Sequence, residues 1–387
     1  CLLSRGLGDV YKRQMKDILK ITVSLAGRTV GTLQMTPERD RCVFEYDKEW
    51  MADGFSISPW ELPFQTGLIY SKERSLGGGF AAFEDSMPDG YGLYLLDRML
   101  RREGSSLGEL SPLQRLSLVG QSGMGALCYQ PEVSQEQTSN LTDIDFDELQ
   151  LKALDVLSEK SDADASFLYY NSRNSGGARP KAVFKDADGT DWIVKFRHVY
   201  DPLDIGKVEY HYMKTAQKCG IDIPEIRLIH DSYFCIQRFD IQKDRRIHTL
   251  TAAALLQIDF RTQSIDYVNL LALTGYLTQD PVQVEQMFRR MVFNIVCINK
   301  DDHAKNFSFL CENGQWRLAP AYDITYSPQG TRGEHATSVK YSGRPCLEDV
   351  IAAGTGIRIS RKRCMEIIEE IESVCCTELD RVESLTS

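Results

Sequence analysis

The 387-residue sequence lacks several features that would assign it to a large class of proteins. It contains no run of about 18 apolar residues, so no transmembrane helix is expected. It has no excess of basic residues, since its formal net charge is −10, which argues against loose binding to nucleic acid or to an anionic membrane. It also lacks the GK[ST] motif of a Walker phosphate loop and any visible internal repeat. A local basic groove is still compatible with this balance.

The eleven cysteines contain no CxxC pair. They are scattered singly through apolar contexts, as at Cys235 and Cys297, and Cys375-Cys376 fits a half-buried helix surface. This distribution favours buried, reduced thiols in a cytoplasmic protein over disulfides or a zinc site.

A hydrophobic content of 42% in a chain of this length predicts two domains or three. Residues 1–14 differ in character from the rest of the chain and are expected to be a non-native leader, with Met15 as the natural start. The polar stretch 131–146 is the expected domain boundary. We therefore expect three segments after the leader, at residues 15–135, 136–240 and 241–387.

Hydrophobic periodicity predicts a β-rich start and a largely helical end. The expected strands are 21–25, 30–34, 42–47, 126–129, 182–185, 192–196, 226–229 and 232–237, and the expected helices are 93–102, 112–119, 146–158, 207–218, 283–298 and 361–382. The glycines at 120, 123 and 125 lead into a strand, and no lysine follows them. They are therefore interpreted as a structural turn rather than a phosphate loop.

The stretch from Asn299 to Asp323 carries the strongest chemical pattern. Asp301 and Asn306 stand five residues apart, a β-hairpin with a turn at Asn313-Gly314 is expected next, and Asp323 follows it. A phosphoryl-transfer enzyme needs a carboxylate to accept the hydroxyl proton of its substrate. It also needs an amide and a second carboxylate to hold Mg²⁺ on ATP. The stretch offers these three groups in that order, although a solvated turn with capping side chains gives the same pattern.

Upstream residues offer the other parts of an ATP site in the expected order. Gly176 and Gly177 allow the backbone to approach a polyphosphate, and Arg179 and Lys181 add positive charge. Lys195 follows Trp192-Ile-Val in the expected strand 192–196, two strands after the glycine loop. A lysine there is either a surface residue or the residue that bridges the phosphates. Glu209, expected in the first turn of its helix, either pairs with that lysine or only favours the helix dipole.

These residues carry a resemblance to a known family. With GGARPK at 176–181, QRFD at 237–240, DDHAKN at 301–306 and AYDI at 321–324, the chain resembles the HipA family of bacterial toxin kinases over about residues 17 to 375. The resemblance implies an α+β fold: a two-lobed, protein-kinase-like core with a β-rich N-terminal subdomain (15–135). The small lobe with the glycine loop would then be residues 136–240 and the helical lobe residues 241–387.

The resemblance implies an ATP- and Mg-dependent serine/threonine kinase that acts as the toxin of a toxin–antitoxin pair. Its expected partner is a small helix-turn-helix antitoxin of the HipB type, through which alone it would contact operator DNA. Its expected substrate is a serine of an aminoacyl-tRNA synthetase, glutamyl-tRNA synthetase being the best-known case in the family. No membrane partner is implied.

The family's site residues are carried over by motif. Asp301 is the expected catalytic base, and Asn306 and Asp323 are the expected metal ligands. The other expected nucleotide contacts are Gly176, Gly177, Ala178, Arg179, Lys181, Lys195, Glu209, Gln237, Arg238, Phe239, His303, Lys305 and Tyr322.

Some positions depart from the family pattern or have two interpretations. Gln237 replaces a common acidic residue, so the adenine contact is expected through the backbone or in altered form. The family's autophosphorylated serine aligns with Asn174, and Ser175 is the expected replacement. Asp302 is interpreted as solvated or as a support of the turn, and His303 as a hydrogen-bonding support. Lys305 either approaches the γ-phosphate or is solvated.

Two other functions stay open at this point. Small-molecule and lipid kinases share the same Asp-x4-Asn arrangement, and a non-catalytic protein could keep the fold to bind a regulator. The acceptor of labelled phosphate, protein or metabolite, distinguishes the first from a protein kinase. The presence of all the base and metal residues argues against the second.

Overall fold

The computed structural model describes residues 18–72, 79–102, 104–133, 145–172, 176–262, 264–330 and 332–386. The expected leader at 1–14 and most of the expected boundary at 131–146 lie outside these residues. The chain divides into two compact units. The first unit comprises residues 1–202 and 240–250, and the second unit comprises residues 203–239 and 251–387. The three expected segment boundaries stay predictions.

An antiparallel sheet forms the start of the first unit, as predicted. Its described strands follow the order β4-β3-β2-β1-β5, with β1 Lys20–Leu25, β2 Arg28–Met35, β3 Cys42–Tyr46, β4 Ile69–Tyr70 and β5 Leu127–Gln130. Alternate side chains of β3 are buried, which gives the sheet one apolar face. On that face the ring of Phe44 lies 5.3 Å from Phe83 and 6.5 Å from Phe80.

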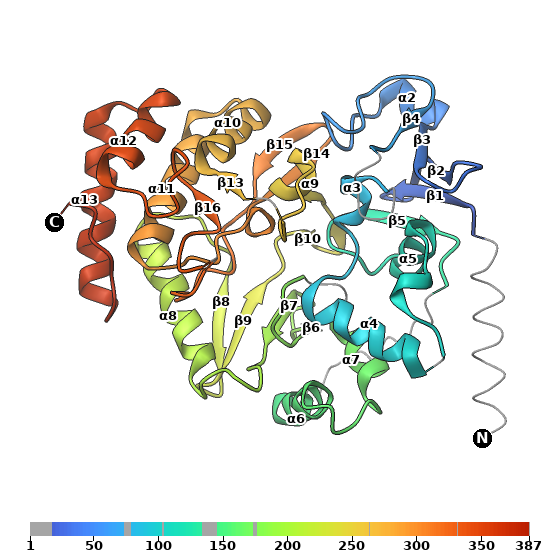
Figure 1. Ribbon diagram of the computed structural model, residues 1–387, viewed down its shortest axis with the longest axis horizontal. Coiled ribbons are helices and arrows are strands. Elements are labelled where there is room, and N and C mark those ends of the chain that lie inside the picture. The colour runs from blue at the N-terminus through green and yellow to red at the C-terminus, as the bar shows by residue number, and fades with distance from the viewer. Residues whose placement is uncertain are drawn as a thin grey trace. The chain divides into compact units, whose positions relative to one another are not determined.

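Helices make up much of the rest of the first unit, and α4, α6 and α7 supply most of the buried side chains of a second apolar cluster. Helix α7 lies beside both α4 and α6 (Figure 1). The helices are α2 Lys48–Asp53, α3 Ala81–Glu84, α4 Gly90–Arg102, η1 Leu107–Glu109, α5 Pro112–Val119, α6 Phe146–Leu157 and α7 Ala165–Ser172. The expected helices at 112–119 and 146–158 are confirmed. The helix expected at 93–102 is also confirmed but begins at Gly90, three residues earlier.

The glycine turn at 120–125 is structural, as predicted. Arg246 of strand β11 (Arg245–Arg246) donates to the carbonyl oxygens of Gln121, Gly123 and Gly125. The Gly125 amide donates to Asp240 Oδ2 at 2.9 Å, just before strand β10 (Ile241–Gln242). One guanidinium and one carboxylate thus satisfy several backbone groups of this turn. These bonds hold the turn in one conformation, as expected of a structural turn.

His248 in β12 (His248–Thr251) gives the first unit a pH-dependent stability. Its buried Nε2 donates to Ile57 O at 2.7 Å, and burial lowers the pKa of the imidazole from 6.5 to about 4. As the pH falls below 6.5, the unfolded chain takes up the proton before the folded chain does. The contribution of His248 to the free energy of unfolding is therefore fully present above pH 6.5. It is lost progressively as the pH falls towards 4, and the loss is about 2 kcal/mol at pH 5. Urea unfolding at pH 7 and pH 5 measures this loss. In His248→Gln, which keeps a donor, the loss should shrink, and equal losses in both proteins would refute the assignment.

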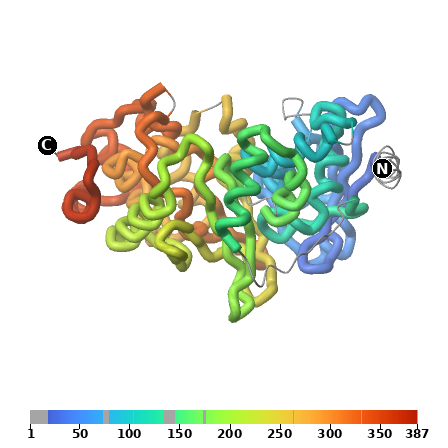
Figure 2. Tube along the Cα trace, turned by 90° about the horizontal axis from the view of Figure 1, so that it is seen from below, coloured from blue at the N-terminus to red at the C-terminus, as the bar shows by residue number. Residues whose placement is uncertain are grey.

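The second unit begins with helix and strands and continues as a mainly helical body, as predicted. Its elements are α8 Ile205–Lys218, β8 Ile226–Ile229, β9 Tyr233–Gln237, α9 Ala252–Leu256, β13 Ile265–Asp266, α10 Tyr267–Thr278, α11 Pro281–Val296, η2 Ala304–Asn306, β14 Ser308–Glu312, β15 Gln315–Leu318, β16 Thr337–Ser338, α12 Leu347–Gly356 and α13 Arg361–Glu378. Both views place α12 and α13 side by side (Figure 1, Figure 2). The last helix ends at Glu378 rather than at the expected Val382, because Leu379 is extended.

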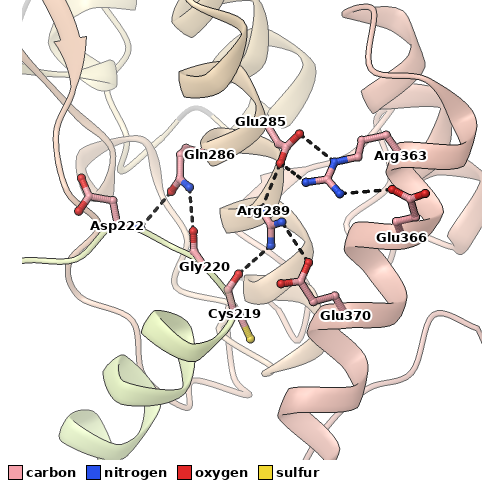
Figure 3. A network of polar contacts seen from close by, with 9 residues as sticks. All are labelled: Cys219, Gly220, Asp222, Glu285, Gln286, Arg289, Arg363, Glu366 and Glu370. Carbon is pink, nitrogen blue, oxygen red and sulfur yellow. Dashed lines mark hydrogen bonds and ion pairs between the residues drawn. The ribbon is translucent and has the colours of Figure 1, made fainter.

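Helix α11 is the buried centre of this body, and a polar network fixes its first half (Figure 3). Arg289 donates to Cys219 O at 2.9 Å and to Glu370 at 3.0 Å, and so joins α11 to the end of α8 and to α13. Arg363 of α13 makes two bonds to Glu285, at 2.7 and 3.0 Å, and holds the pKa of that carboxyl below its usual value. Among the described residues, no helix is both long and apolar enough to span a bilayer.

Removal of the buried member of this network should cost far more stability than removal of the exposed one. Arg289 is 7% exposed, and Arg289→Ala should lower the free energy of unfolding by about 3 kcal/mol, since Cys219 O and Glu370 lose a charged donor. Arg363→Ala is the matched control, because its side chain is 40% exposed and its loss should cost about 1 kcal/mol or less. Chemical denaturation of both variants measures the two losses in free energy of unfolding. Equal losses would contradict the prediction.

Candidate active site

The turn with the expected base lies between the buried end of α11 and strand β14. After α11 the chain has a left-handed residue, Ile298 (φ 58°), and the Asn299 amide donates a hydrogen bond to Asn294 O at 2.9 Å. The neighbouring residue Lys300 donates its amide to Ser327 O and accepts the Ala336 amide on its carbonyl. Backbone bonds from distant parts of the second unit therefore fix where the turn begins.

The two adjacent aspartates of this turn have opposite environments. The Asp301 side chain is 65% exposed, whereas the Asp302 side chain is completely buried. Asp302 Oδ2 accepts hydrogen bonds from Tyr267 OH at 2.8 Å and from His335 Nδ1 at 2.9 Å, and Oδ1 accepts the Thr337 amide at 3.2 Å. The prediction that Asp302 supports the turn is confirmed, and the alternative that it is solvated is wrong.

The partners of Asp302 were not identified from the sequence. Burial and the neighbouring charge of Asp302 raise the pKa of Tyr267 well above its ordinary value, and Asn294 Nδ2 donates to the same hydroxyl at 2.9 Å. His335 and Thr337 lie more than thirty residues further along the chain, in a Gly/Ser/Thr-rich segment without strong periodicity. Within that segment, the single histidine, His335, was the feature of the sequence that could have indicated a partner for Asp302.

Asn306 is oriented by the turn itself. Its Nδ2 donates to the carbonyl oxygen of Asp301 at 2.8 Å, so its amide oxygen is the atom left for a cation. In the described part of the chain, no group of three or more His, Cys, Asp or Glu side chains could hold a metal ion. An amide oxygen and a single carboxylate suit Mg²⁺ bound mainly through substrate phosphates and water, which needs no such cluster.

Asp323 follows a segment that other residues of the second unit anchor. The Ala321 amide donates to Asp222 O at 2.8 Å, and Gln286 in turn accepts the Asp222 amide at 2.9 Å (Figure 3). The buried Arg290 donates to Ala319 O at 2.6 Å, and burial lowers its pKa to about 10. Asp323 itself has φ 54°, a left-handed conformation that aspartate tolerates better than most residues.

The structure brings together three of the expected nucleotide contacts, Tyr322, Lys305 and Phe239. The Tyr322 hydroxyl donates to Lys305 O at 2.7 Å and lies 2.5 Å from Ser308 Oγ. Its ring lies 5.4 Å from the ring of Phe239, at the end of the expected hinge. Within the hinge, Arg238 is buried, and the Gln237 amide donates to Glu225 O at 2.9 Å.

Phe260 is a further neighbour of the turn that the sequence did not reveal. The His303 ring lies 5.0 Å from it, and Lys305 Nζ lies 5.5 Å from its centre. His303 Nε2 is 3.9 Å from Asp301 Oδ1, and Nδ1 has no hydrogen-bond partner within the described ranges. The expectation of a hydrogen-bonding support is therefore wrong in its chemistry, because the His303 side chain supports the turn by ring packing.

The expectation for Glu209 needs one correction. Helix α8 begins at Ile205, so Glu209 lies in the second turn, and it is only 2% exposed. A buried carboxylate needs a partner, so a role restricted to the helix dipole does not explain it. Its expected pairing with a strand lysine stays a prediction.

The glycine loop belongs to the first unit and precedes the hairpin of β6 (Lys181–Lys185) and β7 (Asp191–Lys195). Gly176 (φ 67°) and Gly177 (φ 79°) are both left-handed, as a glycine pair allows. Lys181 is 6% exposed, donates to Gly176 O and faces Lys195 directly in the β6–β7 register.

Two further positions complete the description of this loop. Arg179 is bound by Asp201, at 3.1 and 3.4 Å. The expected autophosphorylation site, Ser175, lies outside the described residues.

Comparison with solved structures defines the class of fold. The chain matches HipA from a structure of the Shewanella oneidensis toxin–antitoxin system, a complex of HipA, HipB and operator DNA. The match has a TM-score of 0.68 and 17% identity and covers 94% of this chain and 92% of that one. The fold is therefore kinase-like and of mixed helix and sheet, as expected, with a β-rich N-terminal region and a mainly helical C-terminal part.

Comparison with protein families places the chain. Residues 174–377 match the HipA-like C-terminal domain, and residues 21–130 match the HipA N-terminal domain. The chain belongs to the HipA family, which confirms the resemblance seen in the sequence.

Two curated relatives agree with this placement. The serine/threonine-protein kinase toxin HipA of Shewanella oneidensis is 23% identical over 79% of this chain and 75% of its own length. Y4dM of Sinorhizobium fredii, which carries a provisional kinase name, is 25% identical over 45% of this chain and 46% of its own length. The chain thus spans about half the length of the second relative.

Proposed function

We propose that this protein is an ATP- and Mg-dependent serine/threonine protein kinase and the toxin of a HipA/HipB-like pair. The observation that carries the proposal is the geometry of the turn at 301–306. The side chain of Asp302 is buried and bound from three sides, while the adjacent Asp301 side chain is exposed. A carboxylate presented to solvent on a turn that is fixed from within is suited to accept a proton from a bound hydroxyl.

In the proposed reaction, Asp301 accepts the proton of the substrate serine as the serine oxygen attacks the γ-phosphorus of ATP. The bond between that phosphorus and the β–γ bridging oxygen breaks, and ADP leaves. Asn306, with its amide oxygen, and Asp323 would hold Mg²⁺, which supplies charge neutralisation on the phosphates. Tyr322 and Phe239, with Gln237 and Arg238, would line the adenine end of the site.

The first unit supports the proposal through its lysines. Lys181 and Lys195 occupy directly opposite positions in the antiparallel β6–β7 pair, just after the glycine loop. Lysine and arginine side chains are the usual phosphate-binding groups of proteins, and Arg179 adds a third cation near the loop. We propose that these three side chains, with Gly176, Gly177 and Ala178, bind the phosphates of ATP. Glu209 is proposed as the partner of Lys195, and His303 and Lys305 as residues that shape the phosphate end.

The partner and the substrate are proposed from the family. The Shewanella structure contains HipB and operator DNA beside HipA, which supports a helix-turn-helix antitoxin as the partner of this chain. A net charge of −10 fits contact with DNA through the antitoxin rather than directly. The proposed substrate is a serine of an aminoacyl-tRNA synthetase of the glutamyl type, so the protein would act in the cytoplasm. Ser175 is the proposed site of autophosphorylation.

Phosphate transfer from γ-³²P-ATP tests the proposal. The purified chain is incubated with Mg²⁺ and glutamyl-tRNA synthetase, and a parallel reaction contains EDTA. Label on a synthetase serine, lost with EDTA, is expected. Label on a metabolite from a small-molecule extract would instead identify a small-molecule kinase. Absence of both transfer and ATP binding would identify a non-catalytic, regulator-binding protein.

A further inference from the structure

The backbone of the glycine loop is bound by a segment that lies almost ninety residues earlier in the first unit. The Gly177 amide donates to Asp89 Oδ1 at 2.5 Å, and the Gly177 carbonyl accepts the amide of Tyr91 at 3.0 Å. Asp89 is 9% exposed, so its carboxylate bond forms largely out of water, where a charge-assisted bond is strong. Both hydrogen-bonding groups of Gly177 are therefore engaged by residues 89–91.

Gly90, between these two residues, permits the approach. It has φ +42°, and a Cβ atom at this position would lie 2.4 Å from Gly177 O, 2.6 Å from Gly177 C and 2.8 Å from Ala178 Cα. All three are backbone atoms, so no side-chain rotation could relieve the overlap. The loop can occupy its present position only while residue 90 has no side chain.

The loop itself does not specify one conformation. Two adjacent left-handed glycines, Gly176 and Gly177, have many conformations of similar energy open to them, and fixing one of them costs backbone entropy. The contacts from Asp89, Gly90 and Tyr91 select one conformation before any ligand binds. A preorganised loop binds its ligand more tightly, because less order has to be imposed on binding.

We propose that Asp89 and Gly90 are positioning residues of the phosphate-binding loop. Residues 89–91 are then part of the nucleotide-binding site, although they lie far from the loop in the sequence. This inference rests on the kinase function proposed above and deepens it. Neither residue is a catalytic residue, since each acts through the backbone of Gly177. The opposite effect on ATP affinity is also testable. If the Asp89 carboxylate instead competed with phosphate for the Gly177 amide, its removal would tighten ATP binding.

Calorimetric titration with Mg-ATP and, separately, with adenosine tests the proposal on Gly90→Ala. The loop contacts only phosphates in this proposal, so affinity for ATP should fall about tenfold while affinity for adenosine stays unchanged. Gly27→Ala is the matched control: Gly27 also has a positive φ (+78°), but its added Cβ would meet nothing within 4 Å. The control should bind both ligands as the wild type does. Equal loss of ATP and adenosine binding in Gly90→Ala would overturn the proposal, because it would indicate general damage to the fold.

Asp89 supplies the second, independent variant. Asp89→Ala removes the acceptor and should weaken ATP binding about tenfold, whereas Asp89→Asn keeps an acceptor oxygen and should restore most of the affinity. In transfer assays, the KM for ATP should rise in Asp89→Ala with little change in kcat. Unchanged or tighter ATP binding by Asp89→Ala would overturn the proposal. A wild type that binds no ATP would refute the proposed function itself, and this result is distinct from either outcome above.

Discussion

Asp301→Ala will reduce phosphate transfer by about a hundred- to ten-thousand-fold while the protein stays folded. The loss is expected because Asp301 is the group proposed to remove the proton from the attacking hydroxyl. The fold should persist because the Asp301 side chain is 65% exposed, and substitutions at such positions usually change stability by about 0.5 kcal/mol or less. Affinity for ATP should also persist, because the proposed contact of Asp301 is with the protein substrate. Transfer of ³²P and calorimetric ATP binding, measured on the same preparation, separate the two effects.

Two further variants make this result specific. Asp323→Asn should also abolish transfer, but by weakening Mg-dependent ATP binding, and asparagine tolerates the left-handed backbone at this position (φ 54°). Asp155→Ala removes a carboxylate of comparable exposure (53%) on helix α6 and should leave transfer unchanged. Retention of transfer by Asp301→Ala would remove this residue from the role of base and with it the main support of the kinase proposal.

Local features of the site were predictable because they depend on neighbouring residues. The hairpin after the turn is an example: Asn313 and Gly314 both adopt the positive φ that its two-residue turn requires, and β14 and β15 pair around them as expected. Helix α11 was equally clear, since apolar residues are frequent along it, with Met287, Phe288 and the run Met291–Phe293 as examples. The order of Asp301, Asn306 and Asp323 along the chain carried the family resemblance that the comparisons confirmed.

Features that depend on distant contacts were not predictable. Helix α8 begins at Ile205 rather than at the expected 207 and so includes Gly206, a poor helix former. Gly206 lies directly against Ser232 O, where a Cβ atom would not fit. Close packing is therefore achieved there at the expense of helix propensity. Because α8 starts two residues earlier than expected, Glu209 lies in its second turn rather than its first. The contact of Asp89 with the glycine loop likewise joins segments whose local sequences contain no sign of each other.

Asp302→Ala will destabilise the second unit by about 3–5 kcal/mol, the largest loss expected from any single change in this region. The substitution leaves Tyr267 OH, His335 Nδ1 and the Thr337 amide without their common acceptor in a buried environment. Because these groups come from separate segments, the turn at 301–306 should lose its connection to residues 335–337. Hydrogen exchange at 300–307 and 335–338 should therefore accelerate together, and chemical denaturation should give the loss in free energy.

Tyr267→Phe is the matched control for this variant. It removes one of the three donors to Asp302, while the carboxylate keeps His335 and Thr337. It also removes the acceptor of Asn294 Nδ2, so the total cost should be about 2 kcal/mol. Asp302→Asn, which retains an acceptor oxygen but loses the charge, should fall between the two. If Asp302→Ala were no less stable than Tyr267→Phe, the buried carboxylate would not hold the turn. The exposure of its neighbour Asp301 would then need another explanation, because a turn that is not fixed from within cannot present a base at a constant position.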